Sequence, residues 1–238
     1  MAIVNRLVDY TEQGTALQGR VYFDDSVSGP RPVVLVAHQW GGRDAFVDGH
    51  AETLAKLGYV GFAIDMYGVG VRGSTVEECS ALLTPFMQDR GLLARRVTAG
   101  LAAARALPEA DTTRIAAIGF CFGGITVLDL ARTGADIRGV VSFHGILKGH
   151  DLPKQPIKAK VLVLHGDKDP LAPIEDYLAL REELTAAGVD WQAHVYGNTL
   201  HAFSDPGANL PELGILHNVV AECRSNQAMH NFLAEVLI

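Results

Sequence analysis

The first part of the chain alternates between apolar and polar residues. Over residues 17–23 this alternation places the apolar side chains on one face, as in a half-buried strand. A second such segment covers residues 7–11, and a turn is expected at residues 12–14. The two segments predict an antiparallel hairpin at the start of the chain.

From residue 33 onward, apolar residues come in continuous runs, which is typical of strands buried on both faces of a parallel sheet. Such strands are predicted over residues 33–37, 60–64, 115–119, 139–143, 161–164 and, less purely, 191–196. Helical spacing predicts helices over residues 45–57, 75–107, 124–132, 174–187 and 218–236. Glycines at 58, 134 and 188 suit the left-handed residue that ends a helix. The alternation predicts an α/β fold with a mostly parallel sheet, an N-terminal antiparallel hairpin and helices on both faces, in one domain over residues 1–238.

The region over residues 75–107 holds two local signals. Ser74 and Glu77 fit a capping box at its start, and Pro85 is expected to divide it into a short and a longer helix. Just before it, residues 68–73 match the glycine pattern of dinucleotide sites. The predicted helix begins only after this pattern, so we interpret it as a loop over the site.

Composition narrows the class of partner. The 238 residues hold 20 Lys and Arg against 27 Asp and Glu, a net charge of −7, which argues against nucleic acid and anionic membranes as partners. No signal peptide or membrane span is expected. The three cysteines are an odd number, which favours reduced thiols and a cytoplasmic location.

The sharpest chemical motif is the Gly-x-Cys-x-Gly sequence around Cys121, at the junction of a buried strand and a helix. It has the form of a nucleophile elbow, in which Gly119 and Gly123 make room for a sharp turn. The helix N-terminus beside the sulfur favours a thiolate. A buried cysteine acting as a small hydrophobe is the less favoured alternative, but it is the preferred interpretation of Cys79 and Cys223.

An elbow nucleophile needs an acid and a base later in the chain. Asp169 and Asp167 follow a buried strand, and we choose Asp169 because it lies deeper in the loop. His201 follows the last predicted strand and is placed to move the thiol proton. Histidines also end three of the predicted parallel strands, where the pocket of an open α/β sheet lies: His38, His144 and His165. Their spacing does not fit a metal site, and no metal is expected.

These motifs resemble those of the dienelactone hydrolase family of the α/β-hydrolase fold. The resemblance covers most of the chain after residue 30 and rests on five segments: residues 38–42, 65–68, 119–124, 166–169 and 201–203. It implies a triad of Cys121, Asp169 and His201. It also implies an oxyanion hole made by the backbone N–H groups of Trp40 and Phe122.

The chain departs from the family's dienelactone-cleaving members at two positions. Those members have Glu where this chain has Gln39, and an Arg after the His-Ala-Phe motif where this chain has Ser204-Asp205-Pro206. An amide cannot accept the thiol proton, so activation of Cys121 would fall to His201 and the helix dipole. Arg72 and Arg43 are the remaining candidates to bind a substrate carboxylate. We expect Gln39, Arg72, His144 and Phe203 to contact the substrate.

The sequence therefore predicts a cytoplasmic hydrolase of small-molecule esters or lactones that forms a thioester intermediate without a cofactor, as a monomer or homodimer. The alternative is a redox or electrophile sensor that uses the thiol of Cys121. Sensors usually need a resolving cysteine, and neither Cys79 nor Cys223 is expected near the elbow.

Overall fold

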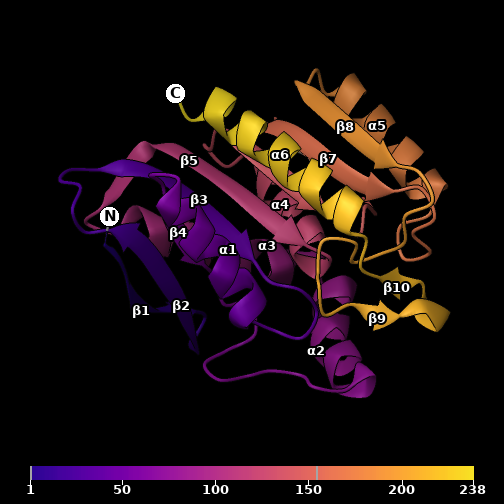
Figure 1. Cartoon of the computed structure of the whole chain (residues 1–238), viewed down its shortest axis with the longest axis horizontal. Coiled ribbons are helices and arrows are strands. Elements are labelled where there is room, and N and C mark those ends of the chain that lie inside the picture. Colours follow the sequence, from indigo (N-terminus) through magenta and orange to yellow (C-terminus); the bar gives the residue numbers. More distant parts are fainter. Residues whose placement is uncertain (1, 154) are drawn as a thin grey trace.

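The computed structural model describes residues 2–153 and 155–238, and an eight-stranded sheet organises them (Figure 1). The strand order is β1-β2-β4-β3-β5-β6-β7-β8. The strands are β1 Ile3–Glu12, β2 Thr15–Asp24, β3 Arg31–Ala37, β4 Val60–Ala63, β5 Ala110–Phe120, β6 Gly139–Phe143, β7 Lys160–Gly166 and β8 Trp191–Tyr196. The helices are α1 Ala45–Lys56, α2 Val76–Gln88, α3 Arg90–Arg105, α4 Phe122–Arg132, α5 Ile174–Ala186 and α6 Val219–Val236.

The direction of the strands matches the two hydrophobic patterns. The alternating segments form an antiparallel hairpin of β1 and β2, and β2 is also antiparallel to β4. From β4 to β8 every neighbouring pair is parallel, and these strands carry the continuous apolar runs. The predicted fold class is confirmed.

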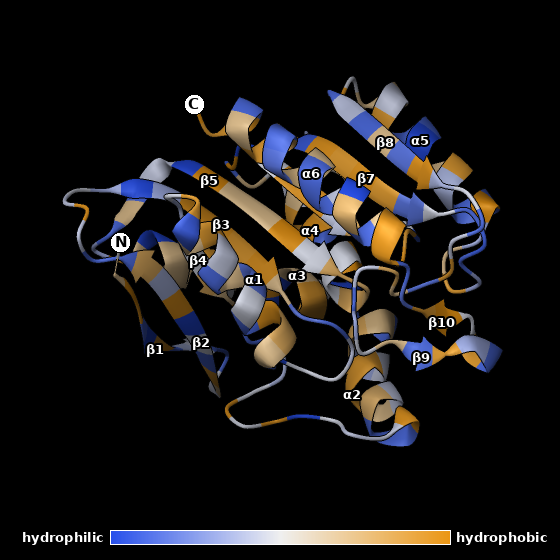
Figure 2. Cartoon of the chain, viewed as in Figure 1, coloured by the Kyte–Doolittle hydropathy of each residue, from blue (hydrophilic) through white to orange (hydrophobic). Residues whose placement is uncertain are grey.

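Helices cover both faces of the sheet, as the alternate residues of β3 show. Val33 and Leu35 belong to a core with residues of α3, α4 and α5. Val34 and Val36 belong to a second core with residues of α1 and α6. In Figure 2 the buried parts of the central strands are largely hydrophobic, as burial on both faces requires, whereas β5 begins with hydrophilic residues that are not buried.

The helix over residues 75–107 begins and divides at other residues than predicted. The capping box is formed by Thr75 and Glu78, and Ser74 donates to the same Glu78 carboxylate. Pro85 lies inside α2, and the break comes at Asp89, whose side chain caps α3. The region does divide into a shorter and a longer helix, but it divides at Asp89 and not at Pro85. Pro85 is tolerated inside α2 because a proline close to a helix end removes only one hydrogen bond.

One element was not predicted. Between β8 and α6, a small hairpin is formed by β9 Asn209–Leu210, the 3₁₀ turn η1 Pro211–Leu213 and β10 Ile215–Leu216. We call this hairpin, residues 209–216, the flap. Strands of two residues give no periodic signal, which is why the sequence does not reveal it. Among the described residues, no helix is both long and apolar enough to cross a membrane.

Candidate active site

Cys121 sits at a sharp turn from β5 into α4. Its backbone has φ +55°, a left-handed conformation that is strained for a residue with a side chain. The two flanking glycines are required by close approach: a Cβ at Gly119 would lie 1.9 Å from the carbonyl oxygen of Gly123, and one at Gly123 would lie 2.1 Å from that of Ala37. The strand, turn and helix expected around Cys121 are therefore all present.

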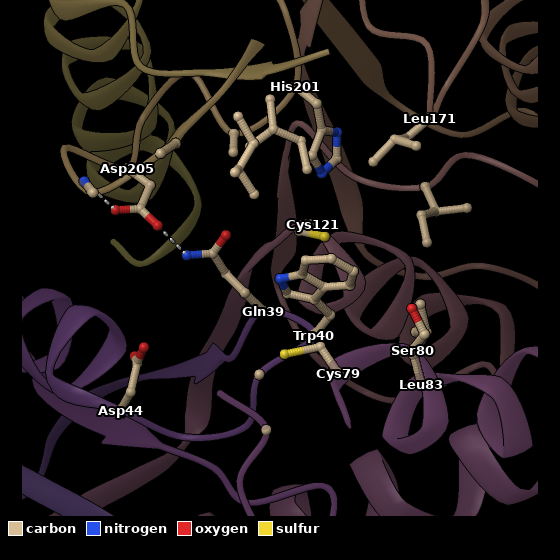
Figure 3. Close-up of a pocket in the computed structure, with 18 of the residues that line it drawn as sticks. Gln39, Trp40, Asp44, Cys79, Ser80, Leu83, Cys121, Leu171, His201 and Asp205 are labelled. Carbon is tan, nitrogen blue, oxygen red and sulfur yellow. Dashed lines mark hydrogen bonds between the residues drawn. The ribbon is translucent and has the colours of Figure 1, made fainter. Parts of the chain in front are cut away.

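The Cys121 sulfur lies at the N-terminus of α4 and on the wall of a cavity, with only 7% of the residue exposed (Figure 3). The first N–H groups of a helix have no partner within the helix, and its dipole is positive at this end. Both effects favour negative charge on the sulfur.

Asp169 and His201, 32 residues apart, meet on neighbouring loops. The Nδ1 of His201 lies 2.7 Å from Oδ2 of Asp169, and both side chains are buried. The other carboxylate oxygen of Asp169 accepts hydrogen bonds from the backbone N–H groups of Leu171 and Ala172, which fixes the orientation of the acid. Asp167, the other acid considered, is exposed and accepts a hydrogen bond from the backbone N–H of Thr199, on the loop that carries His201.

The electrostatics of His201 favour its protonated form. Burial lowers the pKa of the imidazole, but the charge of Cys121 and the hydrogen bond to Asp169 outweigh burial and raise it to about 10. The Nε2 atom of His201 is buried, and the Cys121 thiol interacts with the His201 ring through its charge and a side-chain hydrogen bond. In Figure 3 the His201 ring and the Cys121 sulfur face the same cavity.

His144 and Phe203 were expected to contact substrate, but both are fully buried and neither lies on the cavity wall. The ring centroid of His144 lies 5.2 Å from that of His201 and 5.0 Å from that of Phe203. The Nε2 atom of His144 is 2.8 Å from the Ser204 hydroxyl. His144 therefore packs against His201, and Phe203 packs against His144, instead of reaching the cavity.

The other two strand-end histidines also lie off the cavity wall. The Nδ1–H of His38 donates to the carbonyl of Gln39 at 2.6 Å, and its Nε2 accepts from the N–H of Met66 at 3.2 Å. His165 stacks on Tyr177. These histidines fix the loops that follow their strands.

Neither arginine considered as a carboxylate partner lines the cavity. Arg72 is exposed on the loop over residues 68–73, and only its neighbour Gly73 reaches the cavity wall. Arg43 pairs with Asp48 at 2.9 Å. A direct contact of either guanidinium with substrate has no support in this geometry.

Trp40, on the loop after β3, lines the cavity. No hydrogen bond donated by the N–H of Trp40 or Phe122 is found within the described residues. The hydroxyl of Tyr67 donates to the Trp40 carbonyl at 3.0 Å and so orients this peptide. The Asp65 carboxylate accepts a hydrogen bond from the Tyr67 N–H and so stabilises the turn at Tyr67. This role of Tyr67 was not foreseen, although the tyrosine belongs to a motif noted in the sequence.

The cavity has a volume of about 730 Å³, in the range of small-molecule sites. Its wall includes the flap residues Leu210 and Ile215. Gln39 and Asp205, the two departures from the family pattern, also lie there and contact each other. The Gln39 amide donates to the Asp205 carboxylate at 2.7 Å (Figure 3).

Cys79 lines the same cavity as Cys121. The expectation that no second cysteine lies near the elbow is therefore wrong. The sequence placed Cys79 on the buried side of a helix but gave no sign that this side of α2 forms part of the cavity. Burial raises the pKa of the Cys79 thiol, and the nearby Glu78 and Cys121 charges act in the same direction.

The sheet order and the strand–turn–helix elbow place the chain among the α/β hydrolases. The family model of the dienelactone hydrolase family matches residues 17–237, and the chain belongs to that family.

Relatives agree with this assignment. A putative carboxymethylenebutenolidase of Yersinia pestis is 31% identical over 204 residues, covering 81% of this chain and 76% of the relative. A probable 2-oxo-3-(5-oxofuran-2-ylidene)propanoate lactonase of a Bradyrhizobium species is 26% identical, covering 86% and 87%. A solved dienelactone hydrolase-like promiscuous phosphotriesterase from metagenomic libraries is 38% identical with a TM-score of 0.95, covering all of both chains. The protein is therefore a hydrolase of this family.

Proposed function

We propose that the protein hydrolyses uncharged carboxylic esters or lactones through a thioester on Cys121. The observation that carries the proposal is the 2.7 Å contact between Asp169 and His201. It leaves the other nitrogen of His201 available to the Cys121 thiol at the cavity that both residues line.

The chemistry follows from these positions. The Cys121 thiolate attacks the substrate carbonyl. The new oxyanion accepts hydrogen bonds from the backbone N–H groups of Trp40 and Phe122, and each such donor stabilises the transition state by about 3 to 4 kcal/mol in comparable sites. The carbon–oxygen bond breaks as the His201 imidazolium donates its proton to the leaving alkoxide. Neutral His201 then takes a proton from water, which attacks the thioester, and the carbon–sulfur bond breaks to restore the thiolate. Asp169 holds the imidazole in the required tautomer.

The charges on the cavity wall support an uncharged substrate. Apart from the Cys121–His201 pair, the charged side chains that line it are Asp44, Asp205 and the exposed Lys148, so two of these three are acids. A substrate carboxylate would meet Asp205 where dienelactone-cleaving members offer an arginine. A phosphotriester, the substrate class in the name of one relative, is also uncharged and belongs in the substrate panel.

The test compares turnover of p-nitrophenyl acetate, a panel of neutral lactones and a matched ester that carries a carboxylate. Cys121→Ala should abolish turnover, and Cys223→Ala, which removes an exposed cysteine, should not change it. Rapid quenching and mass spectrometry should find the acyl group on Cys121. Equal turnover by wild type and Cys121→Ala would refute the proposal.

A thiol-based sensor is the second candidate, and the position of Cys79 on the same cavity wall favours it. Peroxide would oxidise the Cys121 thiolate to a sulfenic acid, with hydroxide leaving. The Cys79 thiol would then form a disulfide with Cys121 and release water. Mild peroxide followed by mass spectrometry tests this, because a Cys79–Cys121 disulfide is required and its absence removes the candidate.

A cytoplasmic setting and a monomeric or homodimeric state remain predictions. The three free cysteines support the first, because unpaired thiols persist in reducing compartments. Fractionation of the native host and light scattering of the purified chain test them.

A further inference from the structure

The flap touches the loop that carries His201. Its Ile215 forms a β-bridge with His201. The His201 N–H donates to the Gly214 carbonyl at 2.9 Å, and the Leu216 N–H donates to the His201 carbonyl at 3.0 Å. The flap therefore holds the backbone of His201 through both of its polar groups.

The flap also touches the loop that carries Asp169. Gly214 has φ +72°, and a Cβ at this position would lie 2.2 Å from Cγ and 2.7 Å from Cδ of Pro170. Pro170 directly follows Asp169. Both the left-handed backbone and the close approach require glycine here.

The same two loops meet at another point, next to the sheet. A Cβ at Gly166 would lie 2.4 Å from the Thr199 carbonyl oxygen, which accepts the N–H of Lys168 at 3.0 Å. The acid and histidine loops are thus in contact near the strands, and Gly214 joins them a second time through the flap.

We propose that Gly214 is a positioning residue that sets the separation of the Asp169 and His201 loops. The proposal rests on the proposed function, in which the contact between Asp169 and His201 orients the imidazole. Gly214 is not among the residues on the cavity wall, so it acts through the two loops and not on the substrate. A side chain at this position would push the two loops apart.

The test is Gly214→Ala, with Gly188→Ala as the matched control. Gly188 has nearly the same backbone angle, φ +67°, but nothing lies within 4 Å of its Cβ position. We expect Gly214→Ala to lower kcat about 100-fold with little change in KM, since a shift of about 1 Å in catalytic geometry has an effect of this size. Gly188→Ala should keep the wild-type kcat.

Adding Pro170→Ala to Gly214→Ala should restore most of the lost kcat, because it removes the two ring atoms that the new Cβ would meet. The Asp169 carboxylate would keep its hydrogen bonds to the Leu171 and Ala172 N–H groups, which do not involve the Pro170 ring.

A second readout does not depend on turnover. The proton on Nδ1 of His201, shared with Asp169, can be followed by NMR, as can the titration of the ring, which is surrounded by the ionisable groups Cys121, Asp169, His144 and His165. In Gly214→Ala the Nδ1 proton signal should weaken and His201 should titrate at lower pH. This readout holds even if Cys121→Ala shows that hydrolysis is not the function.

Three results would overturn the proposal: unchanged kcat and NMR signal in Gly214→Ala, an equal loss in Gly188→Ala, or no recovery in the double variant. If Gly214→Ala does not fold, Leu216→Pro removes the N–H that donates to the His201 carbonyl. Wild-type kcat in that variant would overturn the part of the proposal in which the flap positions the His201 loop.

Discussion

Asp169→Asn is the substitution that most directly tests the orientation of His201. The two oxygens of Asp169 have different partners: Oδ1 accepts from the Leu171 and Ala172 N–H groups, and Oδ2 faces Nδ1 of His201. An asparagine that keeps its oxygen toward the two N–H groups turns its NH₂ toward His201. Two donors then face each other, so the imidazole must change tautomer or rotate.

The expected loss follows from that change. With Nδ1 forced to accept, Nε2 carries the proton and cannot take one from the thiol or from water. In triads of this kind the equivalent change lowers kcat about 10⁴-fold, which is about 5 kcal/mol of transition-state stabilisation. Asp169 is not on the cavity wall, so KM should stay near the wild-type value.

Steady-state hydrolysis of p-nitrophenyl acetate measures both constants, and circular dichroism checks the fold. Asp167→Asn is the matched control: Asp167 is an exposed acid two residues earlier, whose contact with a backbone N–H an amide oxygen can keep. A kcat for Asp169→Asn within about tenfold of wild type would refute the reasoning, as would an equal loss in Asp167→Asn.

Three further predictions follow from the site. Gly119→Ala should lower the free energy of unfolding by about 3 kcal/mol, because its Cβ would lie 1.9 Å from the rigid carbonyl oxygen of Gly123; an unchanged urea midpoint would contradict this. The pKa of His201 is raised from 6.5 to about 10 in the folded protein, so the stability that its protonation contributes is complete below pH 6.5 and is lost as pH rises through about 10. A profile of kcat/KM should likewise fall only near pH 10, and a basic limb close to neutrality would refute the assignment. Gln39→Glu should place two carboxylates in contact and lower the free energy of unfolding by about 1 kcal/mol, a loss that adding Asp205→Asn should reverse in denaturant titrations.

The strands were predictable because burial on both faces leaves continuous apolar runs, and all eight strands of the main sheet occur where those runs or the alternating segments predict them. The elbow was predictable for a different reason. Only glycine fits at positions 119 and 123, so the sharp turn at Cys121 requires the two glycines that the motif contains. The predictions that failed concern the start and the break of the helical region over residues 75–107, where two neighbouring residues could cap or end a helix. Thr75 forms the capping box that Ser74 was expected to form, and the break between helices follows Asp89 instead of Pro85.

Predicting which side chains reach the cavity was harder. A residue at the end of a strand can be covered by residues of another loop, and its position along the strand does not show this. His144 ends a strand at the expected edge of the sheet but lies beneath His201. Cys79 has the spacing of a buried helical residue, and only the packing of α2 shows that its buried side forms part of the cavity wall. The flap left no periodic signal at all, yet its Gly214 touches both loops of the acid and the histidine.

The departures at positions 39 and 205 are best understood as one physical change. They are 166 residues apart in the chain, but the Gln39 amide donates directly to the Asp205 carboxylate. A glutamate at 39 would place a second carboxylate against Asp205, and two carboxylates at this distance cannot both stay ionised. Once an aspartate stands at 205, a neutral donor at 39 is the side chain that satisfies it. The exchange removes both a carboxylate that could receive the thiol proton and a cation that could bind a substrate carboxylate. We therefore expect thiol activation to depend on His201 and the start of α4, and substrate selection to depend on fit to the cavity.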